Sequence, residues 1–254
     1  MSLLEINNLS VNFGGIKPVK NFDLTVNDNE LVGLIGPNGA GKTTVFNLLT
    51  GVYIPTEGSI EIDGENIVGK KPYKIVEHGI TRTFQNIRLF KSMTVIDNVK
   101  TACHHHMKYS AMDGILRSKK YKDIEIAVEK EAYRLLEIFD MEDLANETSN
   151  NLPYGMQRKL EIARALAGKP KLLLLDEPAA GMNPNETLEL METIKMINEK
   201  LNVAILLIEH DMSLVMGICQ RIVVIDYGKV IARGTPKEIQ SNKKVIGAYL
   251  GAGA

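Results

Sequence analysis

Eight consecutive residues near the N-terminus have the types and the spacing needed to bind phosphate groups. Residues 36–43 (GPNGAGKT) fit the pattern GxxxxGK followed by Ser or Thr, and they lie after an apolar run, residues 31–35, and before a helical pattern. Glycines let the backbone curl, so that its N–H groups and the start of the next helix surround a β-phosphate. Lys42 would place its charge on the β- and γ-phosphates, and Thr43 would ligate magnesium. A plain turn between strand and helix is the alternative, but the Lys-Thr pair favours a nucleotide site, called the P-loop below.

Two carboxylates follow a second apolar run. Residues 172–175 are four leucines, and Asp176 and Glu177 come directly after them. Hydrolysis of a nucleoside triphosphate needs an acid that holds magnesium and a group that activates water. We expect Asp176 to ligate magnesium and Glu177 to be the base. Without the P-loop, two acids at a solvated strand end would be the better interpretation.

Strand-length runs must position these residues. Residues 3–35 alternate β-rich runs with turns that contain Asn and Gly, and residues 172–175 and 203–208 are apolar runs. Between the last two runs lies a helical pattern whose apolar side consists of Leu190, Met191, Ile194 and Ile197. A strand, a crossover helix and a second strand imply a parallel α/β core.

The segment from about residue 92 to 168 has a helical character instead. Its apolar series recurs at spacings near 3.6 and consists of Ile124, Val128, Leu135 and Phe139. We expect a single domain over residues 1–254, in which residues 1–91 and 169–254 form a nucleotide-binding core and residues 92–168 a helical subdomain.

Composition limits the classes of function. The chain of 254 residues has 30 basic and 31 acidic residues. It therefore lacks the excess positive charge of a general nucleic-acid binder, and we expect no nucleic-acid partner. Cys103 and Cys219 lie far apart without a CxxC spacing, which predicts neither a disulfide nor a zinc site and fits a reducing compartment. No apolar run approaches the ~20 residues that span a bilayer, and no secretory signal is recognisable, so any membrane role would be peripheral.

Further residues resemble the motifs of the ABC ATPase family, in the family's order and over nearly the whole chain. Gln85, in the segment TFQN, resembles the Q-loop glutamine, which implies contacts with magnesium, with the attacking water and with the membrane subunit. His210, in the segment IEHD, resembles the switch histidine that contacts the γ-phosphate, and Phe13 stands where the family has an aromatic residue stacked on adenine. The resemblance implies an α/β P-loop ABC ATPase with a mostly parallel core sheet, an N-terminal antiparallel β subdomain and a helical subdomain.

ATP and Mg²⁺ are the expected ligands, and the expected site residues form three groups. The catalytic group is Glu177, His210, Gln85 and Lys42. The metal ligands are Thr43, Gln85 and Asp176. The nucleotide-binding group is Phe13, Pro37, Asn38, Gly39, Ala40, Gly41, Lys42, Thr43, Thr44 and Gly155.

Two segments depart from the family's pattern. Residues 152–157 (LPYGMQ) occupy the place of the signature LSGGQ and match it in place at Leu152 and Gly155, while residues 160–166 resemble the signature helix and secure the register. In the family this segment covers the γ-phosphate on the P-loop of the other subunit in a head-to-tail dimer. Asn183 replaces the usual Asp of the D-loop, a segment that contacts the other subunit.

Within the family, the chain is most similar to the larger of the two ATPases of branched-chain amino acid importers. The similar segments are residues 83–90, 177–184, 208–212 and the ending 248–251. This resemblance implies transmembrane permease subunits and a second ABC ATPase subunit as partners, in a heterodimer, with a homodimer as the alternative. It also implies a peripheral location on the cytoplasmic face of the cell membrane.

Other functions remain open. Related urea or amide importers share much of the pattern. A soluble ABC ATPase of DNA repair or translation would normally bring a coiled-coil insertion or a second ATPase domain, and a monomeric P-loop kinase or GTPase would lack the signature helix and the switch histidine.

Three further features have more than one interpretation. Residues 103–122, which include His104-His105-His106, are interpreted as a surface excursion rather than a metal site, because adjacent helical residues do not face one another and no acid or Cys cluster lies nearby. The 11 methionines are better explained by packing than by an adaptable binding surface. Leu89, Phe90 and Met93 are either core residues or part of a groove for a membrane subunit.

Overall fold

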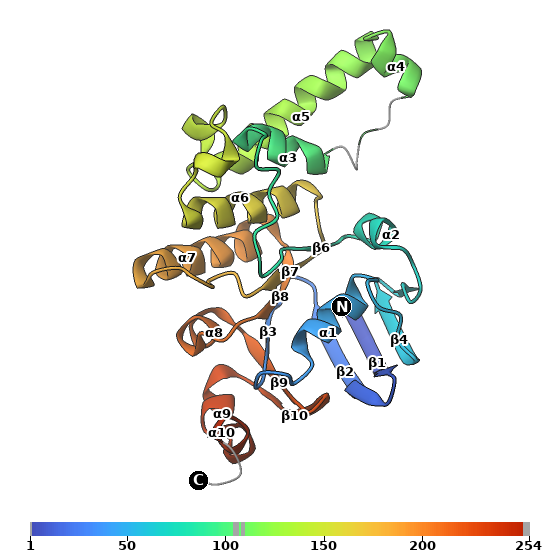
Figure 1. Ribbon diagram of the computed structural model, residues 1–254, viewed down its shortest axis with the longest axis vertical. Helices are drawn as coiled ribbons and strands as arrows, with labels where there is room; N and C mark the ends of the chain where they lie inside the picture. The colour runs from blue at the N-terminus through green and yellow to red at the C-terminus, as the bar shows by residue number, and fades with distance from the viewer. Residues whose placement is uncertain (1, 104–106, 108–109, 251–254) are drawn as a thin grey trace. The chain divides into compact units, whose positions relative to one another are not determined.

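The chain divides into two units, one built mainly on sheets and the other on helices (Figure 1). The computed structural model describes residues 2–103, 107 and 110–250. The first unit, here the core unit, takes its described residues from 1–85 and 171–254, and the second, here the helical unit, takes them from 86–170. The chain therefore leaves the core unit after Gln85 and returns to it at Lys171.

A six-stranded sheet forms the centre of the core unit, in the order β10-β9-β3-β8-β7-β6. β10 is antiparallel to β9, and all other neighbours in this sheet are parallel. The strands are β3 (Leu31–Ile35), β6 (Ile80–Arg82), β7 (Leu172–Asp176), β8 (Ala204–Ile208), β9 (Arg221–Asp226) and β10 (Lys229–Gly234). The predicted mostly parallel core sheet is confirmed.

Both faces of this sheet are covered, which explains the unbroken apolar runs in the sequence. Every residue of β3, β7 and β8 is buried. Alternate residues such as Leu34, Leu174 and Leu206 share one hydrophobic core with α1 (Lys42–Leu49). On the opposite side of the sheet lie α7 (Pro184–Leu201) and α8 (Met212–Ile218) (Figure 1). On α7, Leu190, Ile194 and Ile197 are buried as predicted, and Met191 is half-buried beside Gly217 of α8.

An antiparallel sheet closes the other side of the same core, in the order β2-β1-β4-β5. Its strands are β1 (Ser2–Phe13), β2 (Ile16–Asn27), β4 (Glu57–Ile62) and β5 (Glu65–Asn66), and α2 (Pro72–Glu77) follows them. Leu4, Phe22 and Ile60 join the core that contains Leu34. The predicted N-terminal antiparallel subdomain is therefore confirmed.

The carboxyl ends of the parallel strands meet at one edge of the six-stranded sheet, as parallel pairing requires. β3 runs into the P-loop, and β7 ends at Asp176, opposite Ile208 of β8. Glu209 and His210 follow β8, and Thr83 follows β6. One edge thus collects most of the residues for which chemistry was predicted.

The helical unit contains four helices, α3 (Val95–Cys103), α4 (Ala111–Ile115), α5 (Lys119–Glu137) and α6 (Tyr154–Ala167), and two short 3-10 turns, η2 (Glu142–Leu144) and η3 (Ser149–Asn151), among its described residues. α3 packs against α5 and α6. Of the predicted apolar series, Val128, Leu135 and Phe139 are buried, and Ile124 is half-exposed. The predicted helical subdomain is confirmed.

The chain's last elements in the described residues are α9 (Pro236–Gln240) and α10 (Lys243–Leu250). None of the helices in the described part of the chain is long and apolar enough to cross a membrane. His104-His105-His106 lie outside the described residues. Phe90 and Met93 are 51% and 38% exposed, which rules out the core interpretation for these two. Among the methionines of the described residues, packing in the core explains Met141, which is buried, but not Met93 and Met112, which are exposed.

Candidate functional site

The P-loop connects β3 to α1 by a backbone path that needs glycine. Gly41 has φ 110°, and a Cβ at this position would lie 2.2 Å from the carbonyl oxygen of Pro18. The loop is held from behind, since the N–H of Gly228 donates to the carbonyl of Ala40 at 2.9 Å. α1 begins without a side-chain cap and without an acidic residue in its first turn. Its first N–H groups are therefore suited to an anionic ligand.

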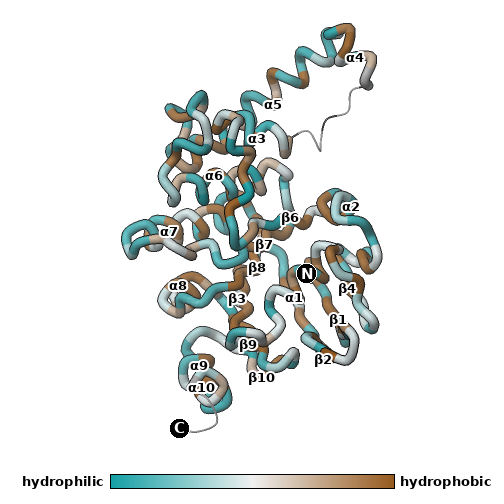
Figure 2. The backbone as a smooth tube through the Cα atoms, in the orientation of Figure 1, coloured by the Kyte–Doolittle hydropathy of each residue, from teal (hydrophilic) through white to brown (hydrophobic). Residues whose placement is uncertain are grey.

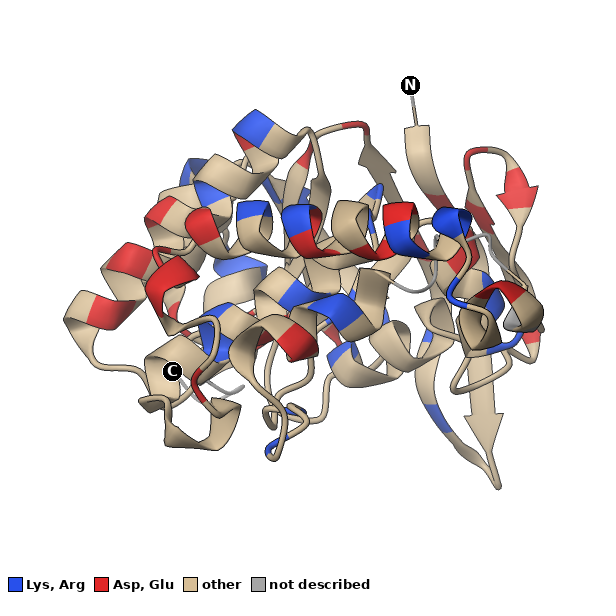
Figure 3. Ribbon diagram, turned by 90° about the horizontal axis from the view of Figure 1, so that it is seen from above, with Lys and Arg blue, Asp and Glu red and all other residues tan. Residues whose placement is uncertain are grey.

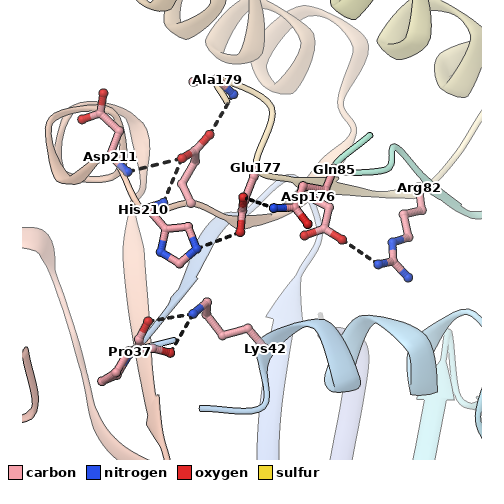
Figure 4. A network of polar contacts seen from close by, with 11 residues as sticks. Pro37, Lys42, Arg82, Gln85, Asp176, Glu177, Ala179, His210 and Asp211 are labelled. Carbon is pink, nitrogen blue, oxygen red and sulfur yellow. Dashed lines mark hydrogen bonds and ion pairs between the residues drawn. The ribbon is translucent and has the colours of Figure 1, made fainter. Parts of the chain in front are cut away.

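Lys42 places its ammonium group inside the curl of this loop. Its Nζ donates to the carbonyl oxygens of Gly36 at 2.7 Å and Pro37 at 3.0 Å (Figure 4), and the residue is buried. Burial lowers the pKa of Lys42 below its usual value, while the nearby carboxylates of Glu177 and Asp176 act in the opposite direction. A desolvated cation with carbonyls as neighbours is well placed to exchange them for phosphate oxygens.

Two predicted catalytic residues form hydrogen bonds with the carboxylate of Glu177, one with each oxygen. Gln85 donates from Nε2 to Glu177 Oε2 at 2.7 Å, and His210 Nε2 lies 2.7 Å from Glu177 Oε1 (Figure 4). The backbone of Glu177 has φ 48°, which non-glycine residues rarely adopt, and its N–H donates to the carbonyl of Ile208 at 2.8 Å. Glu177, Gln85 and His210 therefore come together, although they are distant in sequence.

Asp176 is paired with an arginine that sequence reasoning missed. Arg82 Nη2 donates to Asp176 Oδ2 at 2.6 Å, and Arg82 Nη1 donates to Asn47 of α1 at 2.8 Å. Both side chains of the ion pair are buried. The pairing arises because β6 lies next to β7. The position of Arg82 directly before the segment TFQN is the signal that could have identified it.

Glu209 is a second missed residue, and it joins two loops of the site. Its carboxylate is buried and accepts hydrogen bonds from the backbone N–H groups of Ala179 at 2.8 Å, His210 at 2.8 Å and Asp211 at 3.3 Å (Figure 4). Ala179 belongs to the loop after β7, and His210 to the loop after β8. Glu209 therefore sets the spacing of the loops that carry Glu177 and His210. An acid directly after the apolar run of residues 203–208 was the available signal.

Phe13 makes its aromatic contact with Tyr53, outside the hydrogen-bond network around Glu177 and Glu209. Its ring is 44% exposed and contacts Tyr53 edge to face, with the ring centroids 5.0 Å apart. Tyr53 was missed, because it follows α1 and carries no motif. The exposed pair offers an aromatic surface of the kind on which a base stacks.

The remaining predicted residues have simpler surroundings. Thr43 is exposed and Thr44 half-buried in the first turn of α1, and Pro37, Asn38 and Gly39 form the outer part of the P-loop. Gly155 belongs to the helical unit, in the first turn of α6, whose N-cap is Pro153. Asn183 caps α7, since its side chain accepts from the N–H of Glu186 at 3.0 Å.

The donor set fits magnesium bound together with a nucleotide. In the described part of the chain no group of three or more His, Cys, Asp and Glu residues could hold a metal by itself. In nucleotide sites, however, Mg²⁺ is held by one or two carboxylates and by substrate phosphates, through oxygen ligands. Asp176 and Thr43 supply such oxygens, and the ion pair with Arg82 is made by Oδ2 of Asp176, which leaves Oδ1 for a metal.

Comparison with known proteins assigns the class of protein. Residues 19–180 match the family model described as ABC transporter. Because this match covers more than half of the chain, the chain belongs to the ABC transporter family, as an ATP-hydrolysing subunit. Residues 229–254 match a second model, described as branched-chain amino acid ATP-binding cassette transporter.

Individual relatives extend over nearly the whole chain. The chain is 47% identical to the high-affinity branched-chain amino acid transport ATP-binding protein BraF of Pseudomonas aeruginosa, over 98% of both chains. It is equally similar, at 47% identity and 98% coverage of both chains, to the corresponding protein LivG of Escherichia coli K12. Among solved structures, the ADP conformation of MJ1267, an ATP-binding cassette of an ABC transporter, has a TM-score of 0.85 with 30% identity and covers 99% of both chains.

Proposed function

We propose that this chain is the ATPase subunit of an importer of branched-chain amino acids. The assignment of the solute rests on the two relatives that are 47% identical to this chain and on the match of residues 229–254. In this proposal the chain binds transmembrane permease subunits on the cytoplasmic face of the membrane and pairs head to tail with a second ABC ATPase subunit. The half-exposed side chains of Phe90 and Met93 are available for contacts with a permease subunit.

The observation that supports the proposed chemistry is the pair of hydrogen bonds to the carboxylate of Glu177. A carboxylate held by Gln85 and His210 at 2.7 Å on each oxygen is oriented before any substrate arrives. In the ATP complex Glu177 accepts a proton from the attacking water, and Gln85 and His210 keep the carboxylate and the water aligned. Lys42 moves its hydrogen bonds from the carbonyls of the loop to the phosphate oxygens and stabilises their charge.

Magnesium would be held by Thr43, Asp176 and, through its amide oxygen, Gln85. When bound, it neutralises charge on the β- and γ-phosphates. Arg82 keeps Asp176 in place, because its guanidinium is itself fixed by Asn47 of α1. Phe13 and Tyr53 provide the surface on which adenine stacks.

The test of the base is Glu177→Gln in the purified chain. The amide cannot take up a proton, so steady-state hydrolysis should fall by a factor of at least roughly 100, while ATP affinity is retained. The variant should accumulate as an ATP-bound dimer, whereas a monomeric kinase would not dimerise on ATP. Glu192→Gln, an exposed acid on α7, is the matched control and should hydrolyse ATP at the normal rate. Normal turnover by Glu177→Gln would refute the assignment.

The solute is tested on the native membrane complex. We expect the complex to co-purify with permease subunits, and mass spectrometry to identify leucine, isoleucine or valine as the bound solute. In proteoliposomes, leucine should stimulate ATP hydrolysis and urea or small amides should not. Stimulation of ATP hydrolysis by urea alone would assign the chain to the related urea or amide importers instead. Purification without any membrane subunit would favour a soluble ABC ATPase.

A further inference from the structure

The short helix α4 exposes an apolar face. Met112, Ile115 and Leu116 are 65%, 76% and 72% exposed. Met112 and Ile115 lie on α4, and Leu116 is its C-cap residue; their spacing of three and four residues places the three side chains on the same side of the helix. Figure 2 shows hydrophobic residues gathered on α4. Three neighbouring side chains of this size, all turned to solvent, are an interaction surface rather than scattered surface residues.

This face stands at the end of an arm. The buried residues of α5 begin at Val128, so the first half of this helix, residues 119–127, contains none. Within the helical unit, α5 runs outward and carries α4 at its far end (Figure 1). The arm is therefore not held in place by core packing along its length, and it brings the apolar face away from the rest of the unit.

The tip of the arm nevertheless has a defined local structure. Ser110 and Asp113 form a capping box at the start of α4. Ser118 caps α5 by accepting from the N–H of Tyr121 at 3.2 Å, and its hydroxyl donates to Asp113 at 2.9 Å. These polar residues satisfy the backbone at both helix starts. The apolar face is thus presented by an ordered, capped turn.

Exposed basic residues follow the apolar face along the chain. Residues 110–122 contain four exposed basic residues, Arg117, Lys119, Lys120 and Lys122. Asp113 is the single acid in this range, and its carboxylate accepts hydrogen bonds from Ser110 and Ser118. The chain as a whole has a formal net charge of −1, so this concentration of positive charge is local.

We propose that α4 anchors the protein on an anionic lipid surface, with Met112, Ile115 and Leu116 inserted among the headgroups and the four basic residues in contact with lipid phosphates. Apolar residues on one helix face with a cluster of four Lys and Arg are the combination that binds such surfaces. The face is aliphatic and lacks the aromatic anchors that dominate most protein–protein hot spots. The inference deepens the proposed peripheral location, but its test does not depend on transport.

The test uses vesicles, either of phosphatidylcholine alone or with anionic phosphatidylglycerol added. The full chain should sediment with the anionic vesicles in the absence of permease subunits, and more weakly as salt is raised. Replacing Met112, Ile115 and Leu116 together by Ser should weaken this binding at least tenfold. Replacing the four basic residues by Gln should weaken it by about fivefold for each residue that reaches the surface. ATP hydrolysis by both variants should remain normal, which separates this result from a failure of the proposed function.

A reporter at the tip decides where contact is made. The chain contains no Trp, so Leu116→Trp introduces a single fluorophore. Its emission should shift to the blue with anionic vesicles and be quenched by brominated lipid. Leu188→Trp, at a side chain 58% exposed on α7 in the core unit, is the matched control and should show neither effect.

Three results would overturn the proposal. The first is that the full chain does not bind anionic vesicles. The second is an equal response of Leu116→Trp and Leu188→Trp, which would mean that the contact is not made by α4. The third is a nucleotide-independent dimer that the triple Ser variant abolishes, since the apolar face would then be covered by a second copy of the chain.

Discussion

α1 and α6 begin alike, and they differ in what surrounds their first turns. The N-cap residues are Gly41 and Pro153, neither start has a side-chain cap, and neither first turn contains an acidic residue. Both starts therefore leave N–H groups for an anion. At α1 the buried ammonium of Lys42 adds a cation to these groups. On α6, Arg158 is buried and paired with Glu161 at 2.8 Å.

The difference indicates that the two helix starts have separate roles, one in binding ATP and the other in completing the site of a partner subunit. The P-loop brings donors and a cation from one chain, so it can bind ATP by itself. The first turn of α6, residues 154–157, offers backbone donors and contains no basic residue, which suits a segment that completes a site on another subunit, as proposed for the signature. Nucleotide affinity should then depend on α1, and turnover at the partner's site on α6.

The strongest test of this contrast is Lys42→Ala. Loss of a charge-assisted contact worth ~1.5 to 3 kcal/mol should weaken ATP binding by roughly 10- to 150-fold. Thermal stability should hardly change, since burial disfavours the charge of Lys42 in the folded chain. Calorimetric titration with ATP measures the affinity, and Lys237→Ala, at an exposed lysine on α9, is the control. Unchanged affinity would remove the contrast between the two helix starts.

A second test compares two buried glutamates, one in each unit. Glu209→Gln should reduce the turnover number about tenfold with little change in ATP affinity, because an amide oxygen cannot accept all three backbone N–H groups that position His210 and the loop after β7. Glu161→Gln should instead destabilise the helical unit by about 3 to 5 kcal/mol, since the buried guanidinium of Arg158 would lose the carboxylate that balances its charge. Kinetics and denaturant unfolding of both variants measure the two effects. Equal losses of turnover would contradict separate roles.

Pro153→Ser sharpens the contrast at α6 itself. Proline has no hydroxyl, whereas serine at the N-cap can donate to a γ-phosphate of the opposite subunit or cap α6. In a heterodimer, Glu177→Gln disables the ATP site on the P-loop of this chain. The added Pro153→Ser should then accelerate single-turnover hydrolysis several-fold at the ATP site on the P-loop of the partner subunit. Equal rates with and without the serine would mean that backbone contacts at Gly155 suffice.

The smallest effect concerns one cysteine in each unit. Burial raises the pKa of Cys219 in the core unit to about 12, and burial together with the Glu131 charge raises that of Cys103 in the helical unit to about 11. The unfolded chain releases these protons near pH 9, so it binds fewer protons than the folded chain above that pH. Stability should therefore fall as pH rises above about 9.

Denaturant unfolding at pH 8 and pH 10 checks this slope. Cys219→Ala and Cys103→Ala should each flatten it between these two pH values. Native thiols should also react slowly with iodoacetamide at pH 8 and quickly after unfolding. An identical pH slope in the double variant would show that other groups cause the decline.

The sequence by itself determined the kinds of elements and the residues that carry phosphate chemistry. The P-loop, Asp176 and Glu177 are recognisable because their chemistry is written in contiguous residues, next to apolar runs whose length and composition identify buried strands. Periodicity likewise predicted α7 and the helical unit. These signals act over a few residues, so they can be interpreted without knowledge of the fold.

Only the tertiary structure decided which side chains share a site. Arg82 meets Asp176 because β6 lies beside β7, and Glu209 meets Ala179 because β8 lies on the other side of β7. Strand order results from packing over the whole core, so no local pattern encodes it. The exposure of α4 was equally hidden, because the apolar residues of a helix are core or surface depending on what else packs there. Hydrophobicity is a property of a residue, but burial is a property of the fold.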